Sequence, residues 1–153
     1  MISIYNLFET TIRDKEGNVI ERYHKVGNAE IRKKYWGSKK RGMELTKVDA
    51  HINRDKPDES HVKMSINPGD NGMSGHIDHL QSGKPGHGTR LMRVAARAAK
   101  KGNIENMHWL DHSKKDFYKK ISNSQKPGSI MQVSPNDVLN RTQSRKKHNL
   151  KAN

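Results

Sequence analysis

The chain has 153 residues, a length that suits one domain with its own core, and only 31% of them are hydrophobic. It contains no cysteine, which excludes disulfides, thiolate metal sites and a cysteine nucleophile. No apolar run is long enough to span a bilayer, and Met1–Glu9 lacks the basic leader of a signal peptide, so we expect a cytoplasmic protein with no membrane partner.

The first part of the chain carries a hairpin pattern. Apolar residues from Ile2 to Ile12 indicate a first strand, residues 14–18 form a turn, and residues 19–23 return as its partner. Asn28 is then predicted to cap a short helix through Tyr35.

Aromatic residues stand among cations in the segment that follows. Tyr35 and Trp36 lie within residues 32–41, which are rich in Arg and Lys. Such a pattern is suited to base stacking or cation–π contacts. An aromatic pair at a helix end is more often part of the core, so both interpretations stay open.

Three further strands are predicted between residues 43 and 81. Apolar and polar residues alternate over 43–52 and 61–66, and a turn rich in Pro, Gly and Asn at 67–72 leads to a strand at 74–81. Short connections of this kind join antiparallel strands. The three segments therefore predict an antiparallel meander.

The second half of the chain switches to alternating helices and strands. A glycine-rich turn at 83–89 is followed by a helix at 90–101, a strand at 104–110, a helix at 113–121 and a strand at 129–133. We therefore expect an α+β fold, in which a mixed sheet led by antiparallel strands is flanked by helices.

The domain is expected to cover residues 1–133, followed by a basic and mobile tail at 134–153. Residues 134–139 favour the start of a short helix. Lys and Arg number 30 against 16 Asp and Glu, a formal charge of +14, and the tail holds part of this excess. The charge predicts an anionic macromolecular partner, either nucleic acid or an acidic protein, and leaves the oligomeric state open.

A strand, a glycine-rich turn and a helix in succession form a pattern that is typical of phosphate-binding sites. The turn points several backbone N–H groups at one spot, at the positive end of the helix dipole. Such a spot binds phosphate groups. The sequence GKPGHGTRLM fills Gly83–Met92, and DFYKKI fills Asp116–Ile121 in the later predicted helix.

These two motifs and their spacing resemble the GNAT acyltransferase superfamily over about a third of the chain. Gly83 stands where that family usually has Arg or Gln. The resemblance implies a GNAT-like domain that transfers an acetyl group from acetyl-CoA to an amine. The charge of the chain suggests that the amine belongs to an acidic or nucleic-acid-associated acceptor.

The resemblance also implies which residues bind acetyl-CoA. It places the pyrophosphate on the turn, adds charge from two cations and pairs the pantetheine arm with the end of the preceding strand. The residues are Gly86, His87, Gly88 and Thr89 for the pyrophosphate, Lys84 and Arg90 for the charge, and Leu80 and Gln81 for the arm.

Catalysis in such an enzyme needs a base for the amine and an acid for the departing thiolate. Tyr118 matches the tyrosine that protonates the thiolate in the family. No motif fixes the base, but His76 and Asp78 share one face of the preceding strand and are its candidates.

Two other functions remain open. Asp78, His79, Asn106 and His112 form the pattern of a metal-dependent His-Asn-His nuclease, in which a histidine activates water and a metal ion stabilises the phosphate. A non-catalytic basic protein on the same scaffold could instead bind nucleic acid or an acidic protein. His24, His51 and His148 are interpreted as surface residues with no shared site.

Overall fold

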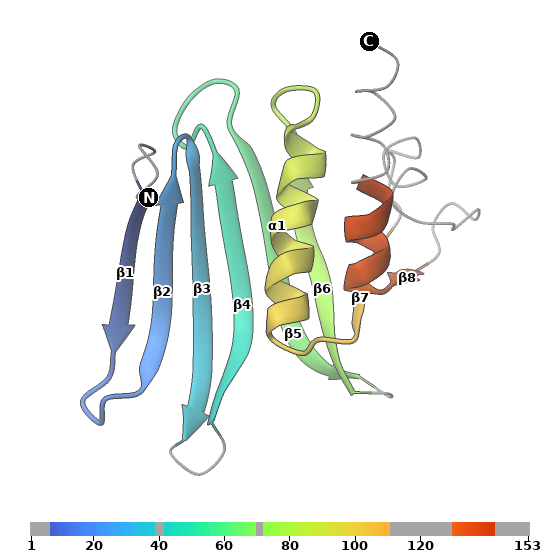
Figure 1. Cartoon of the computed structure of the whole chain (residues 1–153). Helices are drawn as coiled ribbons and strands as arrows, with labels where there is room; N and C mark the ends of the chain where they lie inside the picture. The colour runs from blue at the N-terminus through green and yellow to red at the C-terminus, as the bar shows by residue number, and fades with distance from the viewer. Residues whose placement is uncertain (1–6, 39–41, 70–71, 111–129, 143–153) are drawn as a thin grey trace.

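The computed structural model describes residues 7–38, 42–69, 72–110 and 130–142 of the chain. These residues form one sheet of eight strands that lie side by side in sequence order (Figure 1). The strands are β1 Leu7–Arg13, β2 Val19–Val26, β3 Ala29–Ser38, β4 Gly42–Ile52, β5 Ser60–Gly69, β6 Gly72–Gln81, β7 Asn106–Leu110 and β8 Ile130–Val133.

The connections determine the direction of each strand. The strands β1 to β6 follow one another along the chain with short connections, and each of the five neighbouring pairs is antiparallel. The helix α1, His87–Lys101, connects β6 to β7, which run parallel. The last strand, β8, pairs with β7 in the antiparallel direction.

Both helices of the described chain cover the same face of the sheet (Figure 1). The helix α1 packs on β4, β5 and β6. A second helix over residues 135–142 lies beside it, and Arg93 of α1 donates a hydrogen bond to Thr142 Oγ1 at 2.6 Å. The opposite face of the sheet carries no helix from the described residues.

The core lies between the sheet and α1. Apolar and polar residues alternate from Val48 to Ile52 in β4 and from Val62 to Ile66 in β5, and the buried apolar side chains face the helix side. Small residues on α1 let the helix approach the sheet closely. The fully buried residues of this core include Val48, Ala50 and Ile52 on β4, Val62 and Met64 on β5, and Met92, Ala95, Ala96 and Ala99 on α1.

The predicted α+β fold class, with helices flanking an antiparallel-led sheet in a GNAT-like arrangement, is wrong. The described residues form mostly one β-sheet, and their two helices cover a single face of it. The predicted three-stranded meander is the last half of a six-stranded one. The helix predicted at 113–121 lies outside the described residues.

The segment 28–35, predicted as a helix, belongs instead to strand β3. Its Ala, Glu, Arg and Lys residues are good helix formers, which explains the prediction. In the structure Ile31 and Tyr35 pack against the core, whereas Arg32 and Trp36 on the other face are exposed. Pairing with β2 and β4 on both sides therefore overrides the local preference.

The packed body extends past the boundary expected at residue 133. Residues 135–142 are helical, with Val138 and Thr142 buried. Thr142 Oγ1 donates to the Val138 carbonyl at 2.8 Å and accepts from Arg93, so this helix is tied to α1. No helix among the described residues is long and apolar enough to cross a membrane.

Candidate functional site

The glycine turn between β6 and α1 is shaped by two glycines that no other residue replaces easily. Gly86 has a φ of 87°, in the left-handed region where side chains are strained. A Cβ on Gly83 would lie 2.2 Å from the backbone oxygen of Asp58. Close packing against Asp58 therefore explains why position 83, where the acyltransferase pattern has Arg or Gln, is a glycine.

Two serine hydroxyls already bind N–H groups of this turn. The Gly83 N–H donates to Ser60 Oγ at 2.7 Å, and the Gly88 N–H donates to Ser82 Oγ at 3.2 Å. The Ser82 hydroxyl in turn donates to the Lys84 carbonyl at 2.7 Å. The turn is therefore held in shape by its own side chains, and a phosphate that binds the Gly88 N–H must displace Ser82.

Ser60 also fixes the beginning of α1. It is the first residue of β5, it is completely buried, and its Oγ lies 3.1 Å from His87 Nδ1. A hydroxyl with no solvent access cannot attack an external substrate. The Ser60–His87 contact is therefore a structural link between β5 and the first residue of α1.

The two cations expected at the turn differ in their partners. Lys84 Nζ lies 3.1 Å from Asp58 Oδ2, and this contact is the main reason why the pKa of Asp58 is lowered. Arg90 donates to the neutral Asn28 Oδ1 at 3.1 Å and keeps its charge uncompensated in this contact. The first turn of α1 contains no acid. The helix N-terminus therefore keeps the positive potential that its dipole and Arg90 supply.

The strands β6 and β7 separate shortly before this turn. Their parallel contact covers three residue pairs and ends at His76 opposite His108, although β6 continues to Gln81. A bulge in β6 falls at Asp78, because the pairing with β5 jumps from Ile77 to His79. Beyond the last pair, one edge of β6 has no strand partner among the described residues.

The predicted arm-binding residues lie on this free part of β6. Leu80 and Gln81 pair with β5 on the other side, opposite Val62 and His61. The Leu80 side chain packs partly against the core, and Gln81 is exposed. The structure thus brings the strand end and the turn with Gly86–Arg90 together as one continuous stretch.

The two predicted bases lie where the strands separate. His76 Nε2 is 3.8 Å from Asp78 Oδ1, and Asp78 also accepts a hydrogen bond from Ser65 Oγ. The ring of His108 lies 4.6 Å from that of His76, centroid to centroid, and its Nδ1 is 2.7 Å from Ser74 Oγ. His108 was not a predicted site residue, since only the parallel register brings it to β6.

Burial, and then the neighbouring His76, lower the pKa of His108, while Asp78 opposes the shift. The lowered pKa favours the neutral imidazole of His108 near pH 7, which is the form that a base requires.

The residues of the nuclease hypothesis are not brought together. Asn106 pairs with Ser74, whereas His79 lies five residues farther along β6. At about 3.3 Å per residue, this spacing amounts to roughly 16 Å. His112 and Tyr118, the predicted acid of the acyltransferase, lie outside the described residues.

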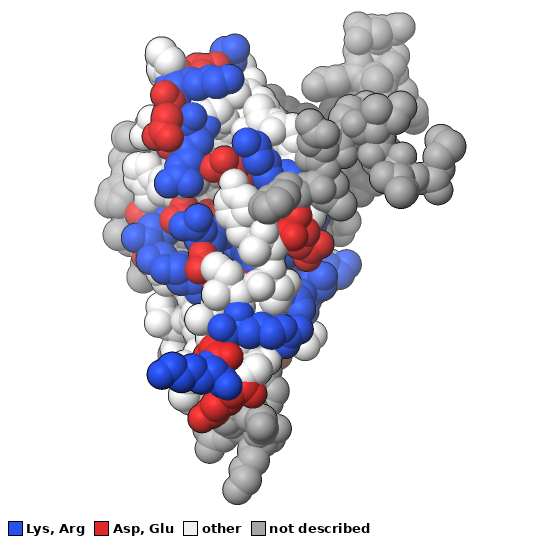
Figure 2. All heavy atoms as spheres, turned by 90° about the vertical axis from the view of Figure 1, so that its left-hand side faces the viewer, with Lys and Arg blue, Asp and Glu red and all other residues white. Residues whose placement is uncertain are grey.

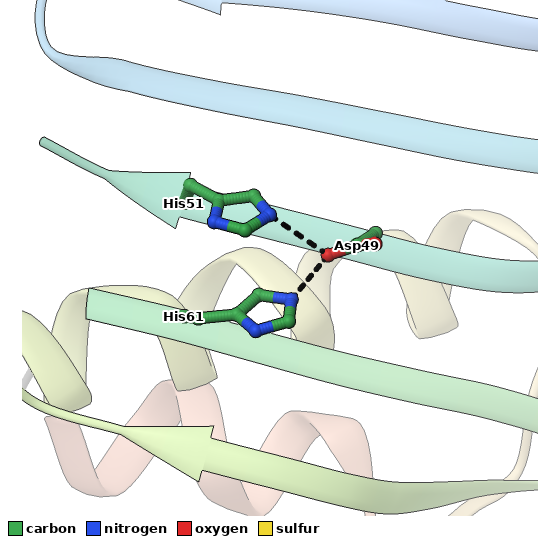
Figure 3. A group of neighbouring side chains, drawn as sticks. All are labelled: Asp49, His51 and His61. Atoms are coloured by element: carbon green, nitrogen blue, oxygen red, sulfur yellow. Dashed lines mark hydrogen bonds and ion pairs between the residues drawn. The ribbon is translucent and has the colours of Figure 1, made fainter. Parts of the chain in front are cut away.

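A second group of side chains lies on the face of the sheet opposite α1 (Figure 3). Asp49 and His51 project from β4, and His61 is the cross-strand partner of His51 on β5. Both histidines direct Nε2 at the same Asp49 oxygen, and their rings stack with centroids 4.0 Å apart. His51, expected to be a surface residue with no shared site, thus contacts Asp49 and His61.

A cationic groove runs along the end of α1 on the helix side of the sheet. The helix α1 leaves β2 and β3 uncovered (Figure 1). Two adjoining pockets, of about 320 and 170 Å³, lie between these two strands and α1. Arg22, Lys33, Arg97 and Lys101 line this groove, and Glu9 is the only acid among the described residues that line it. Burial, followed by the charges of Lys101 and Arg22, lowers the pKa of Lys33.

The β1 side of the molecule has a mixed charge. Figure 2 shows Lys and Arg interspersed with Asp and Glu on this side. The ion pairs of the described residues include Arg32–Glu21 at 2.8 Å and Arg54–Glu30 at 3.4 Å. Twelve of the 30 Lys and Arg residues and three of the 16 Asp and Glu residues belong to segments outside the described residues. Most of the net charge of +14 therefore comes from those segments.

Among known proteins, no family model and no curated sequence matches this chain.

Proposed function

We propose that the protein is an N-acyltransferase that moves an acetyl group from acetyl-CoA to an amine. The observation that carries this proposal is the separation of β6 from β7 after His76, just before the glycine turn that begins α1. The separation leaves a strand edge with no strand partner among the described residues, and this edge leads directly to a helix N-terminus. An extended chain with amide groups can pair with the strand edge, and a pyrophosphate can bind at the helix N-terminus.

The strand edge suits the pantetheine arm of acetyl-CoA. From Ile77 to Gln81 the backbone groups of β6 on the β7 side have no strand partner among the described residues. The arm contains two amides in an extended chain and can add to this edge as a short strand does. The bulge at Asp78 bends β6 at the point where the thioester would lie.

The turn suits the phosphate groups. Helix geometry leaves the N–H groups of Gly88 and Thr89 without an intrahelical acceptor, and rotation of Ser82 would release the first of them. Arg90 adds a full positive charge within the first turn of α1. Lys84 would exchange Asp58 for a phosphate at modest cost, because this ion pair is exposed.

The chemistry requires one base and one acid. The amine nitrogen attacks the thioester carbon, the C–S bond breaks as the tetrahedral intermediate collapses, and the amine proton passes to a base. His108, with its lowered pKa, is the proposed base; the His76 ring lies beside it, and Asp78 favours the positive charge that it gains. The thiolate takes a proton in the last step, for which the acyltransferase resemblance points to Tyr118.

The acceptor amine is proposed to belong to an anionic macromolecule, either a nucleic-acid-associated molecule or an acidic protein. The net charge of +14 supports this choice. The four cations of the groove beside α1 support it further, because like charges gathered around one hollow favour an anionic ligand.

Calorimetry with acetyl-CoA tests the proposal, with two charge reversals on the same helix. Arg90→Glu at the start of α1 should weaken binding about tenfold, as expected for the removal of a charge-assisted hydrogen bond. Arg97→Glu, two turns farther along α1, is the matched control and should bind as the wild type does. The absence of binding to the wild type, or a loss with Arg97→Glu alone, would contradict the proposed site.

A further inference from the structure

We propose that Asp49, His51 and His61 bind a divalent transition-metal ion, such as Zn²⁺ or Co²⁺, on the face of the sheet opposite α1 (Figure 3). This site is separate from the acetyl-CoA site and does not depend on it. One carboxylate oxygen and two imidazole nitrogens lie within 4.8 Å of one another. Two imidazoles and one carboxylate form a ligand set that binds transition-metal ions in preference to Mg²⁺ or Ca²⁺.

The fold holds the three ligands in place through its core. Asp49 and His51 are two residues apart on β4, so both project from the same face, and Ala50 between them is fully buried. His61 lies directly opposite His51, next to the fully buried Val62. A slip of one residue would move His61 to the core side, so the packing of Ala50 and Val62 fixes the geometry of the site.

The hydrogen bonds of His51 leave a lone pair directed at Asp49. His51 Nδ1 is 2.8 Å from Glu59 Oε1, and an ionised carboxylate only accepts, so Nδ1 carries the proton. In a neutral imidazole Nε2 is then an acceptor, yet it lies 3.2 Å from Asp49 Oδ1, another acceptor. These two groups repel unless a second proton or a metal ion lies between them.

His61 makes the metal ion the better solution. Its Nε2 contacts the same Asp49 oxygen as His51 Nε2 does, so three ligand atoms converge on one position. A single divalent ion can accept an electron pair from each of these three atoms, and it removes the repulsion between His51 Nε2 and Asp49 Oδ1.

The surroundings resemble those of a metal site with an open coordination position. Glu59 holds His51 by its second nitrogen, as carboxylates commonly do for metal-bound histidines. The His79 ring lies 5.2 Å from that of His61 and is close enough to supply a further ligand after a side-chain rotation. A pocket of about 40 Å³, which Arg32 and Arg54 also line, borders Asp49 and His51 and has room for a water molecule.

Calorimetry with ZnCl₂ in a buffer that does not chelate metals tests the proposal on the full chain. The wild type should bind one ion with micromolar or tighter affinity, and His61→Ala should lose at least a hundredfold. His24→Ala is the matched control, since it removes a histidine of β2 outside the cluster and should leave the affinity unchanged. Glu59→Gln keeps all three ligands and should weaken binding about 10- to 100-fold.

Co²⁺ absorption gives a second measurement on the same proteins. Intense visible bands of a low-coordinate site are expected for the wild type, and they should disappear in Asp49→Asn. Equal zinc binding by the wild type, His61→Ala and His24→Ala would overturn the proposal, because it would mean that scattered histidines bind the ion. The substituted side chains lie outside the core, and circular dichroism checks that each variant is folded; if His61→Ala is not, the result with Glu59→Gln decides.

Discussion

His76 and His108 face each other at the last parallel pair of the sheet, with ring centroids 4.6 Å apart. Beyond this pair β6 stays paired with β5 up to Gln81 but has no strand partner on its β7 side among the described residues. The end of strand pairing, two imidazoles and the adjacent carboxylate of Asp78 therefore coincide at one point. In the proposed acyl transfer, this point is where the thioester and the amine meet.

His108 predicts the pH dependence of the reaction. Its pKa is lowered below the ordinary 6.5, so the base is already free at neutral pH and kcat/KM should fall only on the acidic side of 6.5. His108→Gln should lower kcat about a hundredfold and remove this acidic limb. A pH–rate profile checks both, and an unchanged limb in the variant would show that another group is the base.

The same shift predicts how stability depends on pH. Because the folded state disfavours protonated His108, the unfolded state binds more protons below about pH 6.5. Stability should therefore fall as the pH drops from 7 toward 5, and the fall should be smaller in His108→Gln. Thermal unfolding of both proteins at pH 7.5 and 5.5 measures the difference, and an identical pH response would contradict the assignment.

Replacing Gly83 or Gly86 of the turn by alanine should lower the free energy of unfolding by different amounts. Gly83→Ala places a Cβ 2.2 Å from a backbone oxygen, which cannot move aside as a side chain can, and should cost about 3 kcal/mol. Gly86→Ala meets open space and should cost only the left-handed strain of about 1–2 kcal/mol. Urea unfolding tests this order, and equal costs would mean that Asp58 does not hold the turn.

Ser82 should separate the stability of the turn from its affinity for phosphate. Ser82→Ala removes the hydroxyl that binds the Gly88 N–H and should lower stability by about 1 kcal/mol. The same change frees that N–H, so acetyl-CoA should bind at least as tightly as before. A clear loss of affinity in a folded variant would show that the Ser82 hydroxyl itself contacts the cofactor.

The cationic groove and the basic C-terminal segment should both contribute to nucleic-acid binding. If Lys33 neutralises one phosphate, Lys33→Ala should reduce the slope of log K against log salt by about 1, whereas Lys56→Ala in the loop after β4 should not. Truncation should begin after residue 142, because Thr142 is buried against α1. If neither Lys33→Ala nor deletion of 143–153 changes the slope, the anionic acceptor is not nucleic acid.

Local patterns predicted most of the elements but not their partners. Alternation located β4, β5 and β6, and apolar spacing located α1, since both depend on neighbouring residues only. The strand β3 was missed because its helix-forming residues are held in a strand by pairing with β2 and β4. The single helix-covered face also depends on how distant segments pack.

The candidate sites show the same division. His76 and Asp78 were found together because they share one strand, and the structure brings them to 3.8 Å. His108 joins them only through the parallel register of β6 and β7, and His51 meets His61 only through the register of β4 and β5. The hydrophobic periodicity of a single segment does not predict how that segment is aligned with a neighbouring strand.

Hydrogen–deuterium exchange with and without acetyl-CoA tests the central claim most directly. The account predicts slower exchange of the backbone amides at 77–81 and at 86–89, where the arm and the pyrophosphate would bind, with little change in β1 to β3. Unchanged exchange in both stretches at saturating acetyl-CoA, or protection confined to the groove beside Lys33, would contradict it.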